Sequence, residues 1–126
     1  FKGFIKTIDA IRALKKTSES LTSEISTLLK THNLSNKKIK SINQQLIAFE
    51  KSFISEKGMY FGSWYKSLYA ASDPFSGYAA WILPGVEYEI ALKSSDRLDE
   101  WDMRYADAIL SLKTKMDNLS LEINTY

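Results

Sequence analysis

The chain has 126 residues, no cysteine and a formal net charge of +2, with 44% hydrophobic and 25% charged residues. Its length and composition are typical of one globular domain, so we expect residues 1–126 to form a single domain or a piece of a larger protein. The lack of cysteine excludes disulfides, thiolate catalysis and cysteine metal sites, and the weak, scattered positive charge argues against nucleic-acid binding.

Apolar residues recur at helical spacing in the first third of the chain. They predict one helix over residues 1–31 and a second that follows a polar turn at residues 32–36. The short connection predicts antiparallel packing, and Asn33 or Ser35 is expected to cap the second helix. The predicted seams are Phe4, Ile8, Ile11, Leu14, Leu21, Ile25 and Leu28 in the first helix, and Ile39, Ile42, Leu46, Phe49 and Phe53 in the second.

The middle of the chain, residues 54–83, has no sustained helical period and is broken by glycines and a proline. It predicts a long aromatic-rich loop, with one short helical turn over residues 63–70. Pro84 is suited to the first turn of a short third helix, which should cover residues 86–92 and end near residues 94 and 95. Since no segment alternates with a period of two, the predicted fold class is all-α.

A last helix is predicted from Asp96 onward, with acidic residues in its first turns. Together the elements predict an up-down bundle of about four helices, with the aromatic loop between the second and third. The apolar stripe expected on the last helix is Trp101, Tyr105, Ala108, Leu112, Met116, Leu119 and Ile123.

No catalytic set or metal site is predicted. The single histidine, His32, falls in a polar turn, and the chain has no HExxH, phosphate-binding or Gly-x-Ser-x-Gly motif. The carboxylates at residues 96–102 are interpreted as a solvated helix N-terminus rather than a metal site. No apolar run is long enough to span a membrane, and no amphipathic helix indicates insertion by this fragment.

The aromatic loop has two interpretations. It can fold over the end of the bundle and complete the core, with Phe53, Trp64, Leu68 and Leu83 buried. Alternatively it forms a contact surface, because tyrosine and tryptophan are frequent at interface hot spots. The candidates for a contact are Tyr60, Trp64, Tyr65 and Tyr69.

The order of these features resembles the C-terminal helical domain of the transferrin receptor and glutamate carboxypeptidase family, the transferrin receptor-like dimerisation domain. The resemblance covers residue 8 to the end. It is most specific in "LIAFEKSFISEKGM" and "WYKSLYAASDPFSGYAAWILPGVEYEI", which hold the pair Trp64-Tyr65, Tyr78-Ala79 and Pro84-Gly85. The lysine- and asparagine-rich composition favours a fungal, vacuolar-protein-sorting-like member.

The resemblance implies that residues 1–126 are a single dimerisation domain, a C-terminal fragment of a larger protein. Such a domain is non-catalytic, assembles a homodimer and packs on a peptidase-like domain of its own chain. It implies a lumenal, vacuolar or extracellular position in a single-span membrane protein. Any zinc would belong to the peptidase-like domain, with no cofactor in this one. The sequons at Asn33 and Asn118 are possible glycosylation sites in such a compartment.

The resemblance also offers an alternative role for the loop. In peptidase members a lysine-tyrosine pair of this loop lines the substrate pocket, and these positions match Gly77 and Tyr78 here. The loss of the cation weakens the case for recognition of an acidic substrate. A further alternative is a sorting adaptor that binds another protein's helix in an apolar groove.

Overall fold

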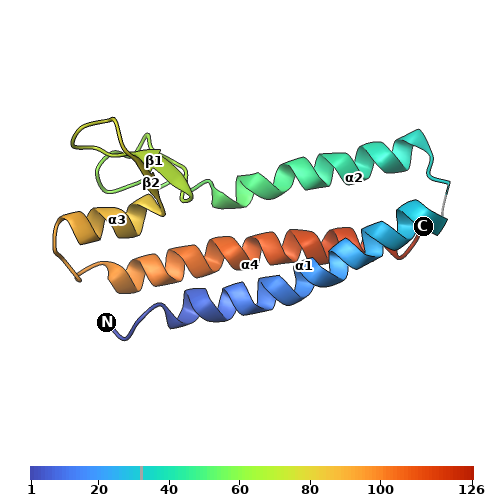
Figure 1. Ribbon diagram of the computed structural model, residues 1–126, viewed down its shortest axis with the longest axis horizontal. Coiled ribbons are helices and arrows are strands. Elements are labelled where there is room, and N and C mark those ends of the chain that lie inside the picture. The colour runs from blue at the N-terminus through green and yellow to red at the C-terminus, as the bar shows by residue number, and fades with distance from the viewer. Residues whose placement is uncertain (32) are drawn as a thin grey trace.

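The structure is a computed structural model that describes residues 1–31 and 33–126. The expectation that His32 is exposed and non-catalytic therefore lies outside the described residues. The elements in chain order are α1 (Ile5–Thr31), α2 (Asn36–Ala48), the 3₁₀ helix η1 (Phe49–Phe53), β1 (Ala70–Ser72), β2 (Ala80–Ile82), α3 (Pro84–Ala91) and α4 (Leu98–Ile123). Figure 1 shows α1 and α4 side by side, with α2 running back along them and β1, β2 and α3 together at one end.

The fold is predominantly helical, as predicted, but it is not all-α. An antiparallel pair joins β1 to β2, with Ala71 opposite Trp81. Local bonds close this hairpin, because the Asp73 carboxylate accepts from the backbone N–H groups of Phe75, at 2.7 Å, and Ser76, at 3.0 Å. Strands of three residues are too short to show alternation, so the periodicity missed them.

The helical turn predicted over residues 63–70 is also wrong. This part of the chain forms turns and isolated bridges, which pair Ile54 with Ser67 and Met59 with Gly62, and residue 70 already belongs to β1. The segment between η1 and α3 is thus an ordered loop that is fixed by short-range backbone pairing. Turn chemistry, rather than helix propensity, determines its path.

Helix α4 supplies most of the core. Its predicted stripe is confirmed by burial at Trp101, Tyr105, Ala108, Leu112, Leu119 and Ile123, and Met116 packs beside them. A second buried strip on α4, Ala106 and Ile109, faces Ala10 of α1. α4 is therefore covered on two sides, by α1 and by the segment that holds η1 and the loop.

The predicted seam of α1 is correct in its C-terminal half, where Leu21 and Leu28 are buried. It is wrong for Ile8 and Ile11, which are 45% and 49% exposed. Ala10 occupies the core position between them, because two facing alanines allow α1 and α4 to approach closely. The N-terminal half of α1 consequently presents branched apolar side chains to the surface.

Helix α2 is attached to the other two long helices through few residues. Its N-cap is Ser35, one of the two predicted alternatives. The Ser35 hydroxyl accepts a hydrogen bond from the Lys38 N–H at 3.3 Å. Ile42 is the buried residue of α2, whereas Ile39 and Leu46 of the predicted seam are exposed. α2 runs antiparallel to α1 (Figure 1), and Ile42 joins a cluster with residues of both α1 and α4.

The acidic start of α4 is not wholly solvated, because Asp102 is buried. Its carboxylate accepts from the backbone N–H groups of Thr7 at 2.8 Å and Lys6 at 3.2 Å, in the first turn of α1. Burial tends to raise the pKa of Asp102, but these hydrogen bonds outweigh it and the pKa lies below its ordinary value. Asp102 therefore caps α1 from α4, and the expectation of a solvated carboxylate is wrong at this position.

Replacing Asp102 with alanine is expected to lower the free energy of unfolding by about 1 kcal/mol at neutral pH, as for the loss of a helix cap. Because the folded-state pKa is depressed, the charged carboxylate stabilises the protein above about pH 4, its unfolded pKa, and this contribution is lost as the pH falls further. Urea denaturation at pH 7 and pH 3 measures both effects.

The matched control is Asp107→Ala, an exposed acid later on the same helix, which should change stability by less than about 0.5 kcal/mol. An Asp102→Ala loss of the same size at both pH values would contradict the role assigned to the charge.

Candidate functional site

The loop that follows η1 is folded tightly at its start. Gly58 has φ +70°, and a Cβ there would lie 2.3 Å from the carbonyl oxygen of Ser63, so only glycine fits this turn. The Met59 N–H donates to the Tyr65 carbonyl at 3.0 Å. This local pairing brings Tyr60 to the side of α4.

Two residues of α4 attach the loop and α3 to the bundle. The buried Tyr105 hydroxyl donates to the carbonyl of Leu68 at 2.7 Å and accepts from the N–H of Gly85 at 3.3 Å. Gly85 lies against the Trp101 ring, which a Cβ would approach to 2.5 Å. Burial raises the pKa of Tyr105 far above its ordinary value, so the hydroxyl stays a neutral donor and acceptor.

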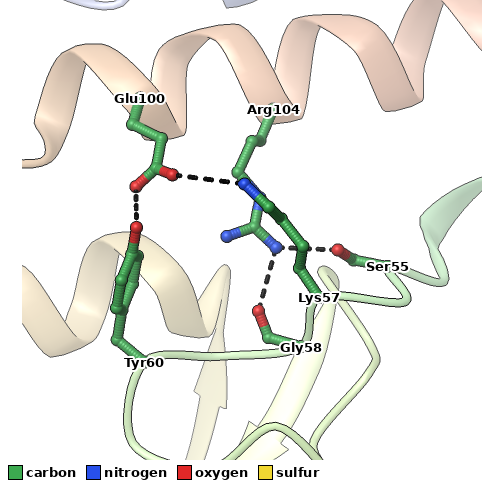
Figure 2. Close-up of polar contacts among 6 residues, drawn as sticks. All are labelled: Ser55, Lys57, Gly58, Tyr60, Glu100 and Arg104. Carbon is green, nitrogen blue, oxygen red and sulfur yellow. Dashed lines mark hydrogen bonds and ion pairs between the residues drawn. The ribbon is translucent and has the colours of Figure 1, made fainter.

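Figure 2 shows a polar network between the loop and the first turns of α4. The Glu100 carboxylate accepts a hydrogen bond from the Tyr60 hydroxyl, and its other oxygen lies 4.0 Å from Lys57 Nζ. The bond to Glu100 is the main reason that the pKa of Tyr60 is raised. The Arg97 guanidinium lies over the Tyr60 ring, 3.8 Å from its centroid. Tyr60 is thereby held in one position although about half of it is exposed.

Arg104 supports the same loop from one turn further along α4. Its Nη2 donates to the Ser55 hydroxyl at 2.7 Å and to the Gly58 carbonyl at 2.9 Å (Figure 2). Its guanidinium also stacks over Trp101, at 4.2 Å from the ring centroid. A surface pocket of about 180 Å³ lies beside it, lined by Lys57, Gly58, Met59, Tyr60 and Arg104.

A buried ion pair supports Arg97 from α3. Glu89 is fully buried, and its Oε1 accepts from Arg97 Nε at 2.6 Å. Its Oε2 has no hydrogen-bond partner among the residues that the structure describes. The sequence predicted neither the Glu89–Arg97 ion pair nor the contacts of Arg104 with the loop. Burial of a single charged residue leaves no periodic pattern in the sequence.

The predicted contact residues lie at different places on this end. Tyr60 lines the pocket with Arg104. Trp64, four residues later in the chain, is 74% exposed, so the expectation that it is buried in the core is wrong. Tyr65 is half-buried against Phe61, with ring centroids 5.1 Å apart. Tyr69 is exposed and lines a separate cavity with residues of η1. Of these candidates, Tyr60 is thus the one that lines the pocket with Arg104, and Trp64 is the most exposed.

The other predicted positions are exposed. Gly77 has φ +75°, and Tyr78 beside it is 96% exposed at the tip of the β1–β2 hairpin. Of the sequon residues, Asn33 lies in the α1–α2 connection, while Asn118 lies on α4 next to the fully buried Leu119. Leu68 is buried, as the core interpretation of the loop required, and Leu83 is 41% exposed.

Within residues 1–31 and 33–126, the structure contains no group of three or more carboxylates or other metal-binding side chains that could hold a metal ion. In the same residues, no helix is long and apolar enough to cross a membrane.

The fold and this end of the molecule define a predominantly helical domain with exposed tyrosine and tryptophan side chains and part-buried arginines, residue types that dominate protein–protein contacts. A family model for the transferrin receptor-like dimerisation domain matches residues 3–117, and the chain belongs to this family. The resemblance inferred from the sequence is confirmed. Comparisons with curated proteins and with solved structures found no match.

Replacing Tyr105 with phenylalanine is expected to lower the free energy of unfolding by about 1–3 kcal/mol, because it leaves the Leu68 carbonyl and the Gly85 N–H buried without this partner. Chemical denaturation measures the loss, and amide exchange should quicken at Gly85. Tyr69→Phe makes the same chemical change at an exposed ring and should leave stability within about 0.5 kcal/mol. Equal effects of the two substitutions would contradict the anchoring role of Tyr105.

Proposed function

We propose that this chain is a non-catalytic dimerisation domain that holds two copies of a transferrin receptor-like protein together. The observation that carries the proposal is the family membership over residues 3–117, combined with two exposed aromatic side chains of the loop, Tyr60 and Trp64, which we call the aromatic end. Rigid aromatic side chains bury a large area at little cost in conformational entropy. Tyr60 is already held by Glu100 and Arg97, so less freedom remains for it to lose on binding.

The surface of the chain is sufficient for such a contact. Specific dimers bury about 800 Å² on each partner, which is about one tenth of the 8298 Å² that this chain exposes. Apolar side chains on α1, among them Ile8 and Ile11, add exposed area that another surface could cover.

Further parts of the proposal come from the resemblance. The domain would pack on a peptidase-like domain of its own chain, and any zinc would belong to that domain. The parent would be a single-span membrane protein with this domain on the lumenal, vacuolar or extracellular side, in a vacuolar-protein-sorting-like role. Asn33 and Asn118 would then be accessible to glycosylation, since both are exposed.

Trp64→Ala is expected to weaken the dimer of the full-length protein at least tenfold, because a truncated aromatic hot spot costs about 2 kcal/mol or more. Sedimentation equilibrium of the wild type and the variant measures the change in dissociation constant. Tyr60→Ala should have a similar effect.

Leu121→Ala is the matched control, since Leu121 is as exposed as Trp64 but lies near the opposite end of α4 (Figure 1). A monomeric wild-type protein at tens of micromolar would overturn the proposed function. A dimer that tolerates both aromatic substitutions would place the contact elsewhere on the domain.

A second candidate function is a contribution to a peptidase substrate pocket in the same chain. The observation that favours it is the hairpin tip, where Tyr78 projects almost fully exposed from a turn that Asp73 holds in shape. Such a side chain is available to another domain or to a ligand. The missing cation at Gly77 argues against strong selectivity for an acidic residue.

If the full-length protein is a peptidase, Tyr78→Phe is expected to raise KM several-fold through the lost hydroxyl contact, while the dimer dissociation constant stays unchanged. Tyr69→Phe, at an exposed tyrosine outside the hairpin tip, controls for the chemical change. Steady-state kinetics with the two variants make the comparison, and unchanged kinetics for Tyr78→Phe would rule this candidate out.

A further inference from the structure

The pocket beside Arg104 carries more positive than negative charge. Its lining includes Lys57 and Arg104, and Arg97 lies directly over the ring of Tyr60 at its edge. Two acids approach these cations: Glu89 is paired with Arg97, and Glu100 is shared between Tyr60 and Lys57 (Figure 2). The three cations around the pocket therefore outnumber the two acids that approach them.

The three cations at the pocket differ in whether an acid of the same chain pairs with them. Arg97 is neutralised by Glu89 at 2.6 Å, and Lys57 lies 4.0 Å from Glu100. Arg104 makes no ion pair in the part of the chain that the structure describes, and its Nη2 donates to two neutral oxygens, the Ser55 hydroxyl and the Gly58 carbonyl. A part-buried guanidinium gains most from a carboxylate, which can take two parallel N–H bonds from its planar fork.

We propose that an aspartate or glutamate side chain of a second copy of this chain enters the pocket and pairs with Arg104 and Lys57. The inference rests on the proposed function, and it adds the charged anchor of the dimer. The volume of about 180 Å³ is sufficient for one carboxylate side chain. The pocket edge carries Tyr60, and exposed Trp64 follows it closely in the chain, which gives the combination of arginine, tyrosine and tryptophan found at interface centres.

A second copy supplies the complementary charge. Several acids of this chain are exposed and have no ion pair among the described residues, and three of them lie near the same end of the molecule as the pocket. These three are Asp96, Asp99 and Asp107. In a two-fold dimer each contact occurs twice, so one acid that reaches the partner's pocket creates two ion pairs.

The direct test is zero-length carbodiimide crosslinking of the full-length protein, mixed from equal amounts of ¹⁴N- and ¹⁵N-labelled chains. The reagent joins the Lys57 amine to a carboxylate in contact with it, and mass spectrometry identifies the acid. The expected product joins Lys57 to an acid within residues 1–126 of the other isotope. A crosslink from Lys57 to Glu100 within one chain is the internal control, because these groups already lie close together.

A dimer whose Lys57 crosslinks are confined to Glu100 of the same chain, or reach an acid outside residues 1–126, would overturn the inference while leaving the proposed function intact. A protein that stays monomeric would overturn both. The two failures are therefore distinguishable in one experiment.

Substitutions supply an independent readout of the same pairing. Arg104→Gln should weaken the dimer at least tenfold at 50 mM NaCl, and the difference from wild type should shrink at 500 mM NaCl because salt screens the ion pair. Lys57→Gln, an exposed change that spares the loop, should weaken it by a smaller factor. Lys40→Gln, on exposed α2, controls for the loss of one positive charge.

Ser55→Ala separates the anchor from the structural role of Arg104, because it removes a hydrogen bond of the guanidinium and leaves the charge in place. If Ser55→Ala and Arg104→Gln weaken the dimer equally, or if Lys57→Gln matches Lys40→Gln, Arg104 only holds the loop and the inference is wrong.

Discussion

The contact of α4 with the loop and with the first turn of α3 is the constraint on which the rest of the structure depends. Trp101 closes over Gly85 because no Cβ stands between them, and the Tyr105 hydroxyl joins Gly85 to the carbonyl of Leu68. These contacts hold the loop, at Leu68, and the first turn of α3, at Gly85, on the surface of α4. Once they are fixed, Arg104 can bind the turn at Gly58, and the aromatic end acquires a defined shape.

The acidic first turns of α4 show how one sequence feature serves several purposes. Asp102 faces α1 and caps its first turn, whereas Glu100, two positions earlier, faces the loop and binds Tyr60. Asp99 remains exposed. Because successive helical residues are about 100° apart, neighbouring carboxylates reach different partners. The cluster is thus a set of separate contacts, of which the exposed members remain free for other molecules.

Sequence periodicity predicted α4 well, because its buried stripe consists of large apolar residues at regular spacing. It failed at Ala10, where a small residue takes the core position and Ile8 and Ile11 are exposed. The β1–β2 pair, the Asp102 cap and the Glu89–Arg97 pair were not predictable by the same means. The strands depend on turn geometry, the cap joins residues far apart in sequence, and the ion pair depends on how α3 and α4 meet. For the proposed contact, the tyrosine and tryptophan content of the loop supplied the candidates Tyr60 and Trp64, which remain predictions, whereas the place of Arg104 beside them required the three-dimensional structure.

The central claim is that the aromatic end, built on α4, is the surface at which two copies meet. Hydrogen–deuterium exchange of the full-length protein, at concentrations above and below its dimer dissociation constant, tests this claim directly. We expect dimer formation to slow exchange in residues 57–66 and at the start of α4, while the far end of α4 stays unchanged. Slowing confined to other segments, with no change in residues 57–66, would contradict the account.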